Sequence, residues 1–184
     1  ITHLDFKDLV DKTVEIPAYA ENSVILSSAE SAHLTDFANQ HQCTINTVLL
    51  AAVALTLKNY ISYQELVMGI TVSGRDPELN CVEDMMGLLI NTLPLRVQPD
   101  PSISIEVFLK ELQDTVQNIH KHSYLPLAQV QSFAPTDRSL FNVIFVFEKQ
   151  PLDDVSKARY TDFNIEEFIG IENTEYPLTI TVLQ

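Results

Sequence analysis

The chain has 184 residues and a net charge of −14, with 46% hydrophobic and 20% charged residues. This length and composition fit one soluble globular domain with a sizeable core, and they exclude an intrinsically disordered chain. The acidic surplus would repel phosphate backbones, so we do not expect nucleic-acid binding. The longest apolar run, Val48 to Leu57, is too short to cross a membrane. No signal peptide opens the chain, and we expect a cytoplasmic location.

The two ends of the chain indicate an excised piece of a longer protein. It starts at Ile1 without an initiator Met and stops at Gln184, directly after an alternating strand pattern. Residues 1–22 show no sustained periodicity and contain Pro17. We therefore interpret residues 1–22 as a connector that leads into the domain proper.

The first regular elements are predicted directly after this connector. Val24–Leu26 is a short apolar run and is predicted to be a strand. Ser27 and Glu30 have the spacing of a capping box, which marks the start of a helix. Apolar residues then recur at helical spacing as far as His41, so the sequence predicts an amphipathic helix here.

A second helix and two strands follow. Thr44 can cap a helix from about Ile45 to Tyr60, which is apolar nearly all round and should therefore be buried. Leu66–Val72 is a nearly continuous apolar run, typical of a strand inside a covered sheet. Leu88–Val97 is predicted to be another strand, and Pro94 within it favours an edge position or a bulge.

The clearest helical pattern in the chain comes after a Pro-Asp-Pro turn. Apolar residues from Ile105 to Ile119 form one face, and Ser102 or Ser104 can cap the helix. Leu140–Phe147 is a third strong strand pattern. The order of these elements, with helices between strands, favours a layered α/β structure.

The last part of the chain is less regular. Residues 148–175 are acidic and weakly patterned, with one strand predicted near Phe163–Ile169. Leu178–Val182 alternates between apolar and polar residues and should close the sheet. The whole pattern predicts an α/β sandwich, in which helices cover one face of a mixed sheet.

No arrangement of nucleophile and base, and no metal site, can be recognised in the sequence. His120 and His122 flank Lys121 at the predicted carboxy-terminal end of a helix. The helix dipole favours cationic side chains at this end, so we interpret the two histidines as capping residues. Cys43 and Cys81 lack metal-ligand spacing and are interpreted as buried or idle thiols in a reducing compartment. Ser73 lies outside any G-x-S-x-G elbow. The residues considered as general bases are His3, His33, His41, His120 and His122.

Two segments nevertheless contain polar residues where a site could form. Arg75 follows a buried strand and a glycine, so it is either a surface charge or the buried partner of a carboxylate. Asn91 and Thr92 lie within an apolar run. Because a buried amide needs partners, Asn91 either ties down backbone or points into a cavity. The residues themselves leave both alternatives open.

These segments resemble the condensation domains of nonribosomal peptide synthetases. The most specific match is Thr71–Arg75 followed by Glu83–Arg96, which is similar to the fifth core motif of that family and its lead-in. Departures from the family pattern are Leu89 in place of the usual Phe, Ser123-Tyr124 in place of Gln-Asp, and a shortened Asp137–Ser139 region. Further similar segments are His122–Leu127, Phe145–Glu148 with Pro151, and Tyr176–Thr179.

The resemblance implies a fold and an organisation. Condensation domains consist of two similar halves of the chloramphenicol acetyltransferase-like fold, with the active site in the cleft between them. The catalytic motif of the family, His-His-x-x-x-Asp-Gly, belongs to the amino-terminal half and is absent from this chain. Residues 23–184 would thus be the carboxy-terminal half, and residues 1–22 the connector from a missing amino-terminal subdomain.

The resemblance also implies a function. The domain would join two carrier-bound aminoacyl or peptidyl groups by amide-bond formation, and this chain would be its acceptor-side half, inactive alone. No cofactor would bind directly, because phosphopantetheine is delivered on the carrier proteins. The implied partners are the missing amino-terminal subdomain, peptidyl carrier proteins and an adjacent adenylation domain. An exposed half-cleft would also favour self-association of the chain.

Site residues implied by the resemblance support the cleft and do not carry the chemistry. Arg75 would pair with the aspartate of the missing motif, and Asn91 would face the tunnel near the reacting centre. Thr92, Gly87 and Ser73 would complete the lining, with no catalytic residue and no metal in this chain. Two alternatives remain: half of a related acyltransferase that uses coenzyme A or a carrier, and a non-catalytic docking platform for carrier proteins.

Overall fold

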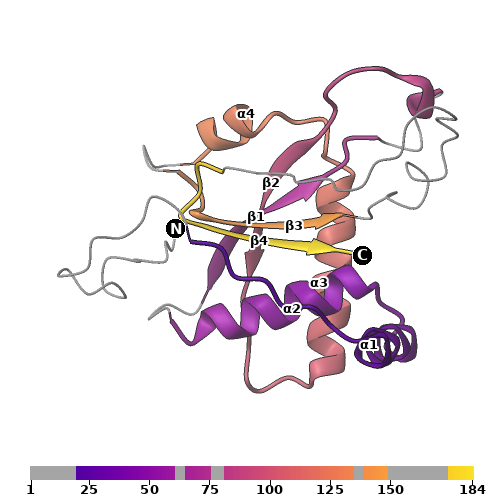
Figure 1. Cartoon of the computed structure of the whole chain (residues 1–184). Helices are drawn as coiled ribbons and strands as arrows, with labels where there is room; N and C mark the ends of the chain where they lie inside the picture. Colours follow the sequence, from indigo (N-terminus) through magenta and orange to yellow (C-terminus); the bar gives the residue numbers. More distant parts are fainter. Residues whose placement is uncertain (1–19, 61–64, 76–80, 135–138, 149–173) are drawn as a thin grey trace, which may run out of the picture.

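The computed structural model describes residues 20–60, 65–75, 81–134, 139–148 and 174–184. The predicted connector, apart from its last residues, and the predicted strand at Phe163–Ile169 lie outside these ranges. The elements in chain order (Figure 1) are α1 (Ser28–Gln40), α2 (Ile45–Lys58), β1 (Leu66–Val72), the 3-10 helix η2 (Val82–Asp84), β2 (Asn91–Val97), α3 (Ile105–His120), α4 (Leu127–Ser132), β3 (Val143–Glu148) and β4 (Leu178–Leu183).

The four described strands form one mixed sheet in the order β2-β1-β3-β4. β1 pairs antiparallel with β2 and parallel with β3, and β3 pairs parallel with β4. The prediction of a mixed sheet with helices is therefore confirmed. β2 lies at an edge of the sheet, as Pro94 indicated, because proline cannot donate to a second neighbouring strand.

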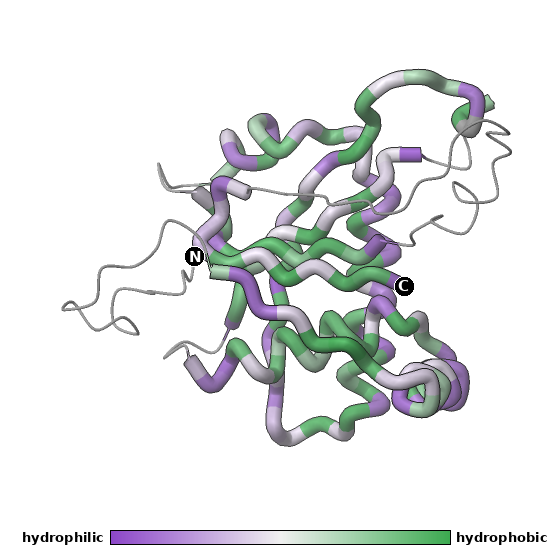
Figure 2. The backbone as a smooth tube through the Cα atoms, viewed as in Figure 1, coloured by the Kyte–Doolittle hydropathy of each residue, from purple (hydrophilic) through white to green (hydrophobic). Residues whose placement is uncertain are grey.

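The core lies between one face of the sheet and the helices α2 and α3. Alternate residues of β1, Leu66, Met68 and Ile70, point into this layer and are at most 5% exposed. In Figure 1, α1 and α2 lie below the strands and α3 crosses behind them. Figure 2 shows that apolar residues concentrate along the strands, whereas α1 is largely hydrophilic. Burial of apolar surface between these layers is the main term that stabilises the fold.

Side-chain caps begin the three longer helices as the sequence predicts. The Ser27 side chain accepts from the Glu30 amide, and Glu30 accepts in return from the Ser27 amide at 2.8 Å, which completes a capping box. Thr44 caps α2, and Ser104, rather than Ser102, caps α3. Each such cap satisfies amide groups that would otherwise lack a partner at a helix start.

A glutamine on α3 fixes the start of α2. Gln113 Oε1 accepts from the Thr44 amide at 3.1 Å and from the Thr47 hydroxyl at 2.5 Å. Thr47 is fully buried, so its hydroxyl needs this partner. The contact holds the two core helices in a defined register against each other.

Several boundaries differ from the predictions. Val24–Leu26 is not a strand; these residues pair with no described strand, and Ile25 is 93% exposed. β2 begins at Asn91 instead of Leu88, and β3 begins at Val143 instead of Leu140. An apolar run alone does not make a strand, because strand formation also requires a neighbouring backbone. α4 and η2 were not predicted, since both are short and lack a side-chain cap.

The helix α2 is buried on one face only. Leu50, Ala51 and Ala54 are at most 2% exposed, whereas Leu55 is 39% exposed. The prediction that this helix is buried nearly all round is wrong, because the elements that pack on it, α1, α3 and β1, leave one face exposed. Among the described residues, no helix is long and apolar enough to cross a membrane.

A glycine in β1 makes room for a buried aromatic ring. A Cβ atom added at Gly69 would lie 2.4 Å from Cε2 of Phe141, which is 1% exposed and stacks on Tyr176. We expect Gly69→Ala to lower the free energy of unfolding by about 1–3 kcal/mol through overpacking, measured by urea denaturation. In the double variant Gly69→Ala/Phe141→Leu, the smaller side chain should recover part of this loss. Strictly additive effects of the two substitutions would contradict the steric explanation.

Candidate functional site

The candidate residues meet at one corner of the sheet because β1 and β2 are antiparallel neighbours. Val72, the last residue of β1, pairs with Asn91, the first residue of β2, and Thr71 pairs with Thr92. Ser73 and Arg75 directly follow β1, so the turn after β1 lies beside the start of β2. Gly87 belongs to the loop that joins the two strands.

Arg75 binds the backbone of its own loop. Its guanidinium donates from Nη1 to the carbonyl of Val82, and from both Nη1 and Nη2 to the carbonyl of Met85 at 3.2 Å. The Arg75 amide also donates to the Ser73 hydroxyl at 3.3 Å. Arginine suits this task because its planar group presents several donors at once. The side chain therefore fixes η2 and the residue after it against the end of β1.

Two glycines shape the same region for different reasons. Gly74 has a φ of +66°, and an added Cβ would lie 1.8 Å from the carbonyl oxygen of Leu89, so the loop passes directly over it. Gly87 has a φ of +145°, which side chains rarely adopt, but it has open space around it. Gly74 is thus required for close backbone approach, and Gly87 for backbone conformation alone.

The loop held by Arg75 presents apolar side chains to solvent. Met85, Met86, Leu88 and Ile90 are 43%, 101%, 88% and 60% exposed. Four large apolar residues exposed within one short loop are unusual for a surface that contacts only water. Since Arg75 and the Gly74–Leu89 approach fix the loop at both ends, these side chains extend from an ordered base.

Asn91 connects the start of β2 to the segment between α3 and α4. Its Nδ2 donates to the carbonyls of Ser123 at 2.9 Å and Leu125 at 2.6 Å. Its Oδ1 accepts from the Thr92 amide at 2.9 Å. Of the two alternatives that the sequence left open, this geometry corresponds to an amide that ties down backbone, since both ends of the side chain are engaged.

The histidines of the described residues fall into two groups, one at α1 and one at the end of α3, next to the segment that Asn91 binds. His33 is on α1, His41 follows α1 and packs against Phe37, His120 ends α3, and His122 lies edge-on to Tyr124. In the described part of the chain, none forms an ion pair with a carboxylate. Partial burial lowers the pKa of His120, which disfavours the cationic form expected at a helix end. His3 lies outside the described residues.

The two cysteines differ in exposure. Cys43 is half-buried and Cys81 is exposed, and both are free thiols. Burial raises the pKa of Cys43, which disfavours the reactive thiolate. Within the ranges described above, no three histidine, cysteine or acidic side chains are grouped so as to hold a metal ion.

A cavity of about 820 Å³ lies at the opposite end of β2, away from the candidate residues. It contains none of the five residues that the sequence singled out. Its walls combine the end of β2 with the first turns of α3, and are lined by Lys58, Arg96, Val97, Gln98, Pro99, Asp100, Pro101, Ile103, Phe108, Glu111, Leu112 and Thr115.

Comparison with known proteins places these features in one family. The condensation-domain family matches residues 11–184. A linear gramicidin synthase of Brevibacillus parabrevis is 37% identical over 181 residues, covering 97% of this chain and 2% of that protein. Gramicidin S synthase 2 of Brevibacillus brevis is 34% identical over 154 residues, covering 82% of this chain and 4% of that protein. The chain thus spans only a few per cent of the length of these relatives.

Solved structures of low sequence identity share the fold. A four-domain nonribosomal peptide synthetase matches 71% of this chain with a TM-score of 0.64 and 19% identity, over 10% of its own chain. The condensation domain of the Monacolin K polyketide synthase MokA matches 68% of this chain with a TM-score of 0.58 and 20% identity, over 30% of its own chain. At these identities the likeness establishes the fold only.

The contacts of Arg75 predict a loss of stability when the side chain is removed. Arg75→Ala leaves the carbonyls of Val82 and Met85 without these donors, so we expect the free energy of unfolding to fall by about 1–3 kcal/mol in chemical denaturation. Arg96→Ala is the matched control, because Arg96 is 64% exposed and its ion pair with Glu65 is at the surface. The Arg96→Ala substitution should lower the free energy of unfolding by no more than about 1 kcal/mol. Equal losses in the two variants would contradict the role assigned to Arg75.

The hydrogen bonds of Asn91 predict that two substitutions of this residue differ in their effect on stability. Asn91→Asp replaces the donating Nδ2 by an oxygen that faces the carbonyls of Ser123 and Leu125, whereas Asn91→Ala only removes the contacts. Both should destabilise the chain, Asn91→Ala by about 1–3 kcal/mol and Asn91→Asp by more at neutral pH. Lowering the pH below about 4 should reduce the difference in stability between the two variants, because a protonated aspartate can donate a hydrogen bond again. Thermal denaturation of both variants at two pH values measures this, and equal stability at neutral pH would be the contrary result.

Proposed function

The chain belongs to the condensation-domain family, and on this basis we propose that it is the acceptor-side half of a domain that forms amide bonds in nonribosomal peptide synthesis. In the proposed reaction, the amine of an acceptor aminoacyl group attacks the thioester carbonyl of a donor group. The new C–N bond forms, the C–S bond breaks, and the amine proton is lost to a base while the thiol is released. The observation that carries the proposal is the family match over residues 11–184.

The contacts of this half support a framework role. The guanidinium of Arg75 and the amide of Asn91 bind backbone carbonyls, so these groups organise loops and are not poised to move protons. The chain contains no adjacent pair of histidines. A framework of this kind contributes by positioning reactants, which accounts for a large part of catalysis in two-substrate reactions. The base would come from the other half of the domain.

The proposed partners follow from the same reaction. Both acyl groups would arrive on peptidyl carrier proteins, attached through phosphopantetheine arms, so no dissociable cofactor is expected on this chain. An adjacent adenylation domain would load the acceptor carrier. The exposed loop with Met85, Met86 and Leu88 offers an ordered apolar surface beside Arg75. We propose that Arg75 also contacts the aspartate of the catalytic motif when the amino-terminal half is present, and that Thr92 and Asn91 line the tunnel.

A reconstitution experiment tests the proposed function. We expect residues 1–184 alone to form no peptide from two loaded carrier proteins, because the chain lacks the His-His-x-x-x-Asp-Gly motif. Addition of an amino-terminal condensation half with an intact motif should restore peptide formation, detected by mass spectrometry of the acceptor carrier. The same half with its second histidine changed to alanine is the matched control and should be inactive.

The other outcomes separate the competing functions. Peptide formation by residues 1–184 alone would contradict the half-site proposal. Acyl transfer to an alcohol acceptor, but not to an amine, in the reconstituted pair would identify a related acyltransferase instead. Carrier binding without turnover in any combination would identify a docking platform.

A further inference from the structure

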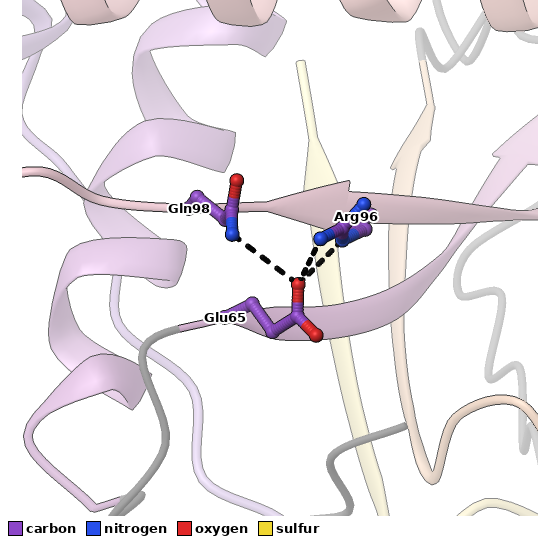
Figure 3. A network of polar contacts seen from close by, with 3 residues as sticks. All are labelled: Glu65, Arg96 and Gln98. Atoms are coloured by element: carbon purple, nitrogen blue, oxygen red, sulfur yellow. Dashed lines mark hydrogen bonds and ion pairs between the residues drawn. The ribbon is translucent and has the colours of Figure 1, made fainter.

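The two ends of β2 are held by different kinds of contact. At the carboxy-terminal end, Glu65 Oε2 accepts from Arg96 Nε at 2.5 Å and from Gln98 Nε2 at 3.4 Å (Figure 3). Glu65 directly precedes β1, so these contacts stay within one pair of neighbouring strands. At the amino-terminal end, Asn91 binds two carbonyls of the segment between α3 and α4, which lies outside the sheet. The start of β2 is therefore attached to a part of the chain that no strand pairing holds.

The segment that Asn91 binds begins a longer stretch, residues 123–134, which we call the strap. The strap contains α4 and lies between the end of α3 and the residues that precede β3. Within the described ranges its backbone hydrogen bonds are all local, for example from the Val130 amide to the Pro126 carbonyl at 3.1 Å and from the Ala134 amide to the Gln131 carbonyl at 3.1 Å. No backbone bond between described residues joins the strap to a strand, so side-chain contacts hold it in place.

The helix within the strap is too short to be stable by itself. α4 has six residues, no side-chain cap and no buried side chain. It packs against β2, and its residues Leu127 and Val130 are half-buried. Isolated helices of fewer than about 12 residues are marginal in water, because fixing the first turn costs more entropy than one hydrogen bond offsets. The helical form of α4 therefore depends on contacts with the rest of the chain.

Side-chain amides bind the strap near both of its ends. At its start, Asn91 Nδ2 donates to the carbonyls of Ser123 at 2.9 Å and Leu125 at 2.6 Å. Near its other end, the Leu140 amide donates to Gln131 Oε1 at 3.0 Å. Leu140 is 7% exposed and lies shortly before β3, so this bond fastens α4 to the body of the domain.

We propose that the strap opens as one unit, released at Asn91 and at Gln131 together, while the sheet and α3 stay folded. The coupling between its two ends arises from α4. Loss of either contact removes part of what keeps α4 helical, and a melted α4 no longer positions the other contact. Proteins open locally in cooperative units of this kind, whose free energies of opening lie below that of global unfolding. The alternative is that the two ends loosen independently.

Opening of the strap changes what Asn91 can bind. In the closed form both carbonyl partners of its Nδ2 belong to the strap, and Asn91 lies opposite Val72 at the corner that contains Arg75. In the open form this donor group lacks its acceptors and can bind a carbonyl group of another molecule instead. The strap is thus a device that engages or releases one donor at the candidate site. It is built from contacts within this chain and does not depend on amide-bond formation.

Native-state hydrogen exchange of residues 1–184, measured by NMR, tests the proposal. In the original chain we expect the Leu125 and Ala134 amides to share one degree of protection, which is lower than that of the amides of β1, an interior strand. Asn91→Ala should speed exchange at the distant Ala134 amide, and Gln131→Ala should speed exchange at the Leu125 amide. Each change should be about tenfold or more, because either substitution lowers the free energy of opening of the whole unit.

Two control variants separate strap opening from a change in helix propensity and from global destabilisation. Gln129→Ala changes an exposed glutamine of α4 whose side chain has no hydrogen bond among the described residues, so exchange in the strap should stay within about twofold of the original. Thr47→Val removes a hydroxyl on α2 that donates to Gln113. It should speed exchange in β1, through a lower free energy of global unfolding, and leave the strap amides unchanged.

The contrary results are equally specific. Strap amides that are as protected as those of β1 in the original chain, or not protected at all, would overturn the proposal. Substitutions at Asn91 and Gln131 that each speed exchange only at their own end would show independent loosening and would also overturn it. Since the two variants make the same comparison from opposite ends, one decides the outcome if circular dichroism shows that the other does not fold.

Discussion

The antiparallel pairing of β1 with β2 brings the polar segments of this chain together. The pair Val72–Asn91 joins the end of one strand to the start of the next, so the turn after β1 lies beside Asn91. From this corner, Arg75 binds the loop that leads into β2, and Asn91 binds the segment that follows α3. Two side chains thereby fix two loops to one strand pair. The remaining features of the corner, including the exposed apolar loop, depend on this frame.

A frame of this kind fits the proposed function, in which this chain positions the reactants and another half of the domain provides the base. The donors of Arg75 and Asn91 are engaged by main-chain carbonyls, which is a use suited to holding geometry. Precise positioning matters in amide formation between two tethered substrates, since small displacements of reacting atoms cost large factors in rate.

Most of the framework, but not its contacts, could be predicted from the sequence. Periodicity indicates α3, a continuous apolar run indicates β1, and a capping box indicates the start of α1, because these signals are local. The prediction of a strand at Val24–Leu26 was wrong, because strand pairing depends on a backbone segment that is distant in the sequence. The helix α4 was not predicted, because a six-residue helix shows little periodicity. The sequence singles out Arg75 and Asn91, but it does not identify their partners. Every residue type offers a backbone carbonyl, so the sequence contains no signal for the contacts with Met85 or Ser123.

Hydrogen exchange of the chain alone tests most directly whether the corner is ordered by its own contacts. The amides of Asp84 and Met85 donate within η2 to the carbonyls of Cys81 and Val82, and the Thr92 amide donates to Asn91. We expect these three amides to exchange well below unfolded-chain rates in residues 1–184 without any partner, because Arg75 and Asn91 hold their surroundings. Exchange at unfolded-chain rates, with protection acquired only when an amino-terminal half is added, would show that the corner is ordered by the other half and would contradict this account.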